Sequence, residues 1–167
     1  LQLRLPTERY YEEEGRAELT PRDFGILMHR VFENAATTDE IYTAIEAMTQ
    51  DGVLDEKEAP RLRELVEKAL ADPVTAEWFG GRWQVVRNEN EIILPGSGTT
   101  RRPDRVMTDG ERAVVVDYKF GDRETARHRK QIREYLHLLR QMGYTRTEGY
   151  LWYVRLGRTE RVEEKED

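Results

Sequence analysis

Apolar residues in the first half of the chain recur every three or four positions, which is the spacing of amphipathic helices. The first apolar stripe runs from Phe24 to Phe32. It follows Thr20 and Pro21, a good N-cap and a residue that fits the first helical turn. Similar stripes predict three further helices, over residues 37–50, 55–70 and 72–79. The first half of the chain is therefore expected to be helical.

The pattern changes to that of strands after Gly80-Gly81. The segment 113–119 is rich in valine and apolar on both faces, as expected of a central strand that is covered on both sides. Helical spacing returns over residues 123–142. Strands are expected over residues 83–86, 91–94, 102–107, 113–119, 149–156 and 159–162. This order of elements indicates an α/β fold with a central mixed β-sheet, flanking helices and an N-terminal helical segment.

The length of 167 residues suits one domain with its own core. We expect an irregular, acidic lead-in over residues 1–19 and a single domain over residues 20–167. The apolar runs are too short to cross a membrane. The lack of cysteine excludes disulfides, thiolate metal sites and cysteine-ligated iron–sulfur clusters, and it fits a cytoplasmic location. The net charge of -6 argues against a nonspecific nucleic-acid coat protein, although basic residues gather over 101–105 and 123–133.

Charged residues interrupt the apolar central strand, where an unpaired charge would be costly to bury. Asp117 and Lys119 are two residues apart, so both side chains should lie on one face of the strand. Asp104, next to the neighbouring strand, can bring a second carboxylate to the same place. Two converging carboxylates suit Mg²⁺ or Mn²⁺, and the lysine could hold a phosphate or a water molecule. The alternative is an ordinary Asp–Lys ion pair, with Asp104 capping a turn.

Four short motifs occur in a consistent order along the chain. Pro103-Asp104 and Asp117-x-Lys119 resemble the PD-(D/E)xK nuclease signature. The segments Gly25-x-x-x-His29-x-x-x-Glu33 and Gln131-x-x-x-Tyr135 resemble helical motifs of RecB-type nucleases, as found at the C-terminus of UvrD/RecB-type helicases. The resemblance covers about residues 20–156, and it implies a restriction-endonuclease-like core with the central sheet and flanking helices described above.

The resemblance also implies roles for individual residues. It makes His29, Asp104, Asp117 and Lys119 the catalytic residues, and it assigns the metal to His29, both aspartates and the backbone carbonyl of Tyr118. Glu33 and Glu89 could support the metal ligands from outside, with Glu91 as a competitor of Glu89. His29 and Tyr135 could instead be core residues. The expected DNA-binding or positioning residues are Gln131, Tyr135, Arg102, Arg105, Arg127 and Lys130, with Arg101 and Arg123 nearby.

The function implied by the resemblance is a Mg²⁺- or Mn²⁺-dependent DNA exonuclease without an iron–sulfur cluster. Its substrate is expected to be single-stranded or frayed DNA ends, in end resection, recombination and repair. The chain opens at Leu1 without an initiator methionine or a signal peptide, as expected of a domain fused to or associated with a helicase. The alternatives are a structure-specific or restriction-type endonuclease of the same fold, a catalytically weak DNA-binding module, and a scaffold whose charged residues form only ion pairs.

Overall fold

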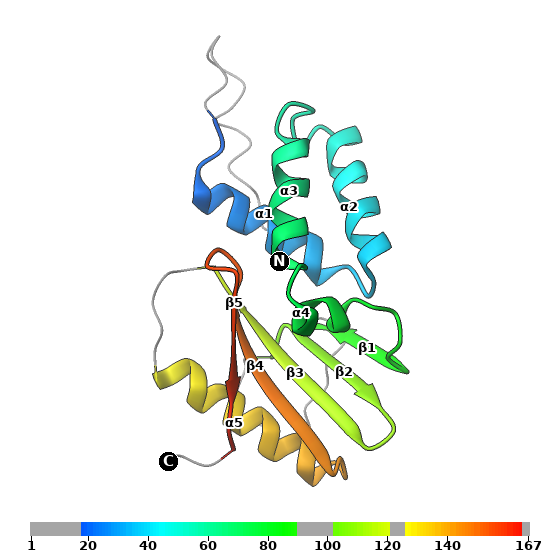
Figure 1. Cartoon of the computed structure of the whole chain (residues 1–167), viewed down its shortest axis with the longest axis vertical. Coiled ribbons are helices and arrows are strands. Elements are labelled where there is room, and N and C mark those ends of the chain that lie inside the picture. The colour runs from blue at the N-terminus through cyan, green and yellow to red at the C-terminus, as the bar shows by residue number, and fades with distance from the viewer. Residues whose placement is uncertain (1–17, 90–101, 121–125, 165–167) are drawn as a thin grey trace.

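The computed structural model describes residues 18–89, 102–120 and 126–164. In these ranges a helical segment precedes a sheet with one inserted helix (Figure 1). The helices are α1 (Pro21–Glu33), α2 (Thr38–Gln50), α3 (Ala59–Ala69), α4 (Pro73–Trp78) and α5 (Ala126–Gln141). The strands are β1 (Val85–Asn88), β2 (Arg105–Asp109), β3 (Arg112–Lys119), β4 (Arg146–Tyr153) and β5 (Arg158–Val162).

The strands form one sheet in the order β1-β2-β3-β4-β5. Neighbouring strands are antiparallel except β3 and β4, which run parallel because α5 carries the chain back between them. Figure 1 shows α5 along one face of this sheet and α1 to α3 beyond one end of it, with α4 beside β1 and β2. The expected α/β fold with a mixed sheet and flanking helices is confirmed.

Two hydrophobic clusters lie on opposite faces of the sheet. The side chains of β3 alternate between them, since Val114 and Val116 join the cluster of α1 to α4 while Ala113 and Val115 join that of α5. Strand β3 is buried over six consecutive residues, which confirms the expected central strand. Asp117 and Lys119 share the parity of Val115, so their side chains belong to the α5 face at the end of β3.

The predicted helix starts are confirmed for α1 and α2. Thr20 caps α1 in a reciprocal capping box, in which its hydroxyl accepts from the Asp23 amide and the Asp23 carboxylate accepts from the Thr20 amide. Thr37 caps α2 by accepting the Glu40 amide. The Glu40 carboxylate instead accepts from the Ala36 amide at 2.6 Å, outside the helix.

Several strand boundaries differ from the sequence-based ones. Strand β2 begins at Arg105 rather than at residue 102, because Pro103 has no N–H and the Asp104 amide donates to a side chain. Strand β1 begins at Val85 rather than at residue 83, and the indole N–H of Trp83 donates to the carbonyl of Glu77 in the last turn of α4. Strand β4 ends at Tyr153, and residues 154–157 form the turn to β5. The expected strand over 91–94 lies outside the described residues.

Helix α5 lies unusually close to the sheet at Gly149 of β4. A Cβ atom on Gly149 would stand 2.4 Å from Cγ2 of Ile132, far inside van der Waals contact. Glycine is therefore needed here for space, and it sets the distance of α5 from the strands. The described part of the chain contains no helix with the length and apolar character to cross a bilayer.

Candidate active site

The end of β3 carries the two charged residues that interrupt its apolar pattern. Lys119 Nζ lies 3.2 Å from Oδ2 of Asp117, so the ammonium group donates to the carboxylate. The two side chains are only 12% and 7% exposed. This confirms that both lie on one face, and it places a nearly buried ion pair at the strand terminus.

Asp104 ties the start of β2 to the end of β3. Its backbone amide donates to Oδ1 of Asp117 at 3.1 Å, and its own Oδ2 accepts the Tyr118 amide at 2.6 Å. These bonds replace the sheet ladder just beyond the last paired residues, Arg105 and Val116. The N–H and C=O of one strand residue point to the same edge, so the Tyr118 carbonyl also faces the Asp104 side. The predicted convergence of the two carboxylates is therefore present.

His29 reaches this point from the last turns of α1. Its Nε2 lies 3.2 Å from Oδ1 of Asp104, and its ring packs edge-on against Tyr118 and Phe120. Gly25, one turn earlier, explains how α1 comes so near, because a Cβ atom there would lie 3.3 Å from Cβ of Phe120. The sequence motif thus has a physical basis: the small residue admits the end of β3, and the histidine four residues later touches Asp104.

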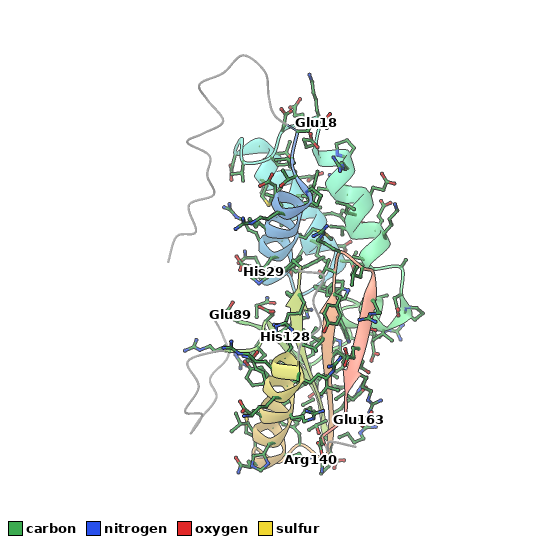
Figure 2. The ribbon with its side chains drawn as sticks, turned by 90° about the vertical axis from the view of Figure 1, so that its left-hand side faces the viewer. Glu18, His29, Glu89, His128, Arg140 and Glu163 are labelled. Atoms are coloured by element: carbon green, nitrogen blue, oxygen red, sulfur yellow. The ribbon has the colours of Figure 1, made fainter. Side chains whose placement is uncertain are left out.

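Two glutamates lie on the other side of His29. The His29 Nδ1 is 3.4 Å from a carboxylate oxygen of Glu33, one turn along α1. One ligand atom each from His29, Glu33 and Glu89 lie within 4.8 Å of one another. Figure 2 shows His29 and Glu89 on the same side of the molecule, where α1 meets the sheet. The structure therefore places the two predicted outer residues beside His29.

Burial and mutual charge shift the protonation of these groups. Burial raises the pKa of Asp117 to about 6, and the nearby Asp104 carboxylate adds to this while Lys119 opposes it. The hydrogen bond to Asp104 raises the pKa of His29, although partial burial works against the shift. Burial also raises the pKa of Glu33, and His29 opposes it. The site thus holds protons more readily than the same groups would in water.

This donor set fits a divalent cation. Four carboxylates surround one lysine and one imidazole: Asp104, Asp117, Glu33 and Glu89. The excess of negative charge in a partly buried place can be offset by a cation of charge two. Carboxylate and carbonyl oxygens with one imidazole are ligands that Mg²⁺ and Mn²⁺ accept. Among the described residues, the three donors that gather within 4.8 Å of one another are His29, Glu33 and Glu89. Asp117 is not part of this cluster, and its link to His29 runs through Asp104.

Of the other predicted site residues that the structure describes, four lie on α5 and Arg102 precedes β2. Gln131 donates to the Tyr135 hydroxyl at 2.8 Å on α5, and Tyr135 is only 2% exposed, so packing is part of its role. Arg102, Arg127 and Lys130 are exposed, and their contact with DNA stays a prediction. Glu91, Arg101 and Arg123 lie outside the described residues.

Arg105 corrects one expectation. It is fully buried, and its guanidinium donates to the backbone carbonyls of Ala35, Ala36 and Trp78 at 2.6 to 2.7 Å. It therefore does not belong to a basic DNA-contacting surface, because DNA cannot reach it. Its parity on β2 was the signal for this: Arg105 shares a face with Met107, which lies in the core cluster of α1 to α4.

Comparison with known proteins agrees with the geometry. No curated protein matches the chain. A protein-family model described as the PD-(D/E)XK nuclease superfamily matches residues 2–167, which include every site residue named above. This match covers far more than half of the chain, and the motif residues Asp104, Asp117 and Lys119 meet in space. The chain belongs to the PD-(D/E)XK nuclease superfamily.

Proposed function

We propose that this nuclease is a Mg²⁺- or Mn²⁺-dependent DNA exonuclease domain of the RecB type, working with a UvrD/RecB-like helicase in end resection, recombination and repair. The observation that supports it best is the continuous set of contacts from Lys119 through Asp117 and Asp104 to His29. A structural ion pair alone gives no reason for a histidine from a distant helix to join it. The RecB-type helix motifs around His29 and Gln131 favour this branch of the family.

The proposed cation is held by His29, Asp104, Asp117 and the Tyr118 carbonyl, with Glu33 and Glu89 supporting His29 or holding a second cation. When bound, it supplies Lewis-acid polarisation of the scissile phosphate. His29 must be neutral to act as a ligand, so the proton that it shares with Asp104 has to leave. Protons and the metal ion therefore compete for the same groups, so metal binding should weaken as the pH falls.

Lys119 is the residue proposed to act on the reacting groups. Its ammonium group, held by Asp117 at 3.2 Å, can donate to the attacking water or to a phosphate oxygen. Because it is only 12% exposed, its charge is weakly screened and acts strongly on the developing negative charge. Asp104 fixes the geometry by bonding both the Tyr118 amide and His29. Water is the proposed nucleophile, and the expected products are a 5′-phosphate and a 3′-hydroxyl.

The substrate is proposed to be single-stranded or frayed DNA. Two exposed cations on the first turns of α5, Arg127 and Lys130, lie on the face of the sheet to which Asp117 and Lys119 belong. Together with Arg102, they can contact the phosphate backbone without reading bases. A cytoplasmic location, which the lack of cysteine fits, and the association with a helicase, which rests on the RecB-type resemblance, belong to this proposal.

Digestion of linear and covalently closed single-stranded DNA, with Mg²⁺ or Mn²⁺, tests the proposal. Cutting of the linear form alone supports an exonuclease, while cutting of both forms favours the endonuclease alternative. The Asp117→Asn variant should lower cutting more than about 100-fold, since a direct ligand should matter more than its supporting residues. Asp109→Asn, an exposed change at the opposite end of β2, should leave it unaltered. DNA binding without metal-dependent cutting by the wild type would contradict the enzyme assignment.

A further inference from the structure

Arg105 is a buried charge that the chemistry described above does not use. It is 0% exposed, and among the described residues no carboxylate forms an ion pair with it. A guanidinium group removed from water costs several kcal/mol unless hydrogen bonds replace its hydration. The fold therefore keeps a desolvated cation at this position, and the contacts of the guanidinium group show what it does there.

The guanidinium group joins three segments that are distant in the chain. Its Nη1 donates to the Ala35 carbonyl at 2.6 Å, and its Nη2 donates to the carbonyls of Ala36 and Trp78 at 2.7 Å each. Nη1 also lies 3.4 Å from the side-chain oxygen of Asn88 in β1. The Phe79 ring covers the group, with its centroid 4.0 Å from Cζ. One side chain of β2 thus fastens the α1–α2 loop, the end of α4, and β1.

Two of these segments, the α1–α2 loop and β1, directly adjoin a donor of the active site, and so does Arg105 itself on β2. Arg105 itself follows Asp104 in the chain, and Asn88 precedes Glu89. The carbonyl of Ala35 lies two residues beyond Glu33, at the end of the helix that carries His29. A shift of the guanidinium would therefore move the donors on α1, β1 and β2 relative to one another.

The chemistry of the anchor requires arginine. Its planar group offers five N–H donors in fixed directions, which can reach carbonyls on different segments at once. A lysine ammonium is a point charge with three donors on a flexible stem, and it cannot span the same set of acceptors. Methionine would fill the space and leave three carbonyls without partners.

We propose that Arg105 is a positioning residue, which holds α1 and β1 against β2 and thereby sets the distances among His29, Glu89 and Asp104. The proposal rests on the proposed metal-dependent function for its activity readouts. It predicts a defect in the assembly of the site that exceeds the general loss of stability.

The test compares Arg105→Lys and Arg105→Met with Leu139→Ala. Leu139 is 3% exposed in the cluster on the α5 face, so its truncation lowers stability without touching the anchor. Because the chain has no cysteine, spin labels can be attached to Arg22→Cys on α1 and Arg87→Cys on β1, both exposed. Pulsed electron paramagnetic resonance then reports the α1–β1 distance without metal or DNA.

Both Arg105 variants should broaden or shift this distance, while Leu139→Ala should keep the narrow wild-type distribution. Mn²⁺ affinity and kcat should each fall about 10- to 100-fold, as for residues that orient metal ligands, with KM for DNA unchanged within about twofold. The Lys variant should not rescue these losses, although it retains the charge. If the Arg105 variants change the α1–β1 distance as expected but the wild type shows no metal-dependent cutting, the proposed function is refuted while the role of Arg105 as an anchor stands.

Three results would overturn the proposal. A wild-type distance distribution and wild-type kcat in Arg105→Lys would show that the charge alone suffices. A raised KM with an unchanged kcat would indicate a contact with DNA. Failure of both variants to fold, or losses no larger than those of Leu139→Ala at equal stability, would reduce Arg105 to an ordinary stabilising residue.

Discussion

The raised pKa of Asp117 predicts that the metal-free protein loses stability as the pH rises. The carboxyl has a pKa of about 6 in the folded chain against an ordinary value of 3.8. Between these two values the folded state binds more protons than the unfolded state, so the free energy of unfolding falls with increasing pH. At about 1.36 kcal/mol per pH unit, the full effect amounts to about 3 kcal/mol.

Acid restores part of this stability within an accessible range. At pH 5, about one unit below the folded pKa, about 1 kcal/mol of the effect is recovered relative to pH 8. His29 acts in the same direction, because its raised folded pKa gives stability at low pH that is lost as the pH rises. Glu148 acts in the opposite direction, since its pKa is lowered. The contribution of Asp117 must therefore be isolated by substitution.

Urea unfolding at pH 5 and pH 8 in the presence of EDTA provides the assay. Lowering the pH from 8 to 5 should raise the free energy of unfolding of the wild type by about 1 kcal/mol more than that of Asp117→Asn. Saturating Mn²⁺ should stabilise the wild type more at pH 8 than at pH 5, because metal and protons compete for the same groups. An identical pH dependence in the wild type and in Asp117→Asn would refute the assignment of a raised pKa to this carboxyl.

Three further predictions concern the approach of the helices and the basic surface. Gly25→Val should reduce cutting at least about tenfold and lower stability by about 1–3 kcal/mol, because the valine side chain pushes α1 and His29 away from Phe120. An unaltered cutting rate in a folded Gly25→Val variant would contradict the close approach of α1 to Phe120. Gly149→Ala should lower the free energy of unfolding by about 1–3 kcal/mol. In a double-mutant cycle, Ile132→Ala should cost less stability in the Gly149→Ala background than in the wild type. Strict additivity of the two losses would mean that the residues do not crowd each other. Replacing Arg127 and Lys130 by glutamine should weaken DNA binding while kcat is retained, and the slope of log K against log[salt] should fall by about 0.7 for each lost contact with single-stranded DNA. Arg146→Gln, at the opposite end of the sheet, should leave DNA binding unchanged. Equal losses in the α5 variant and in Arg146→Gln would remove α5 from the DNA-binding surface.

The centre of the site could be predicted from the sequence because charged residues close together in the chain interrupt a strand that is otherwise apolar. An aspartate and a lysine at the end of a valine-rich strand need a partner, and their spacing places them on one face. The helix motif around His29 added the third segment, and Gly25 shows why the motif begins with glycine. The meeting of His29 with Asp104 followed from the family resemblance, since spacing alone does not say which helix covers which strand end.

Two features could not be predicted in the same way. Charge composition groups Arg105 with its exposed neighbour Arg102, because it treats clustered arginines alike, while strand parity separates them. The nearness of Glu89 to Glu33 depends on the packing of α1 beside β1, which involves residues far apart in the chain. Strand ends were misplaced where side chains take over backbone hydrogen bonds, as Asp104 does for Tyr118.

The location of a bound cation tests the central claim most directly. Crystals of the protein soaked in Mn²⁺ can be measured at the manganese absorption edge, where anomalous scattering identifies the ion. The metal should lie in contact with His29, Asp104 and Asp117, on the side of the Tyr118 carbonyl. Anomalous density confined to a place away from both aspartates, or absent at saturating Mn²⁺, would contradict the proposed active site.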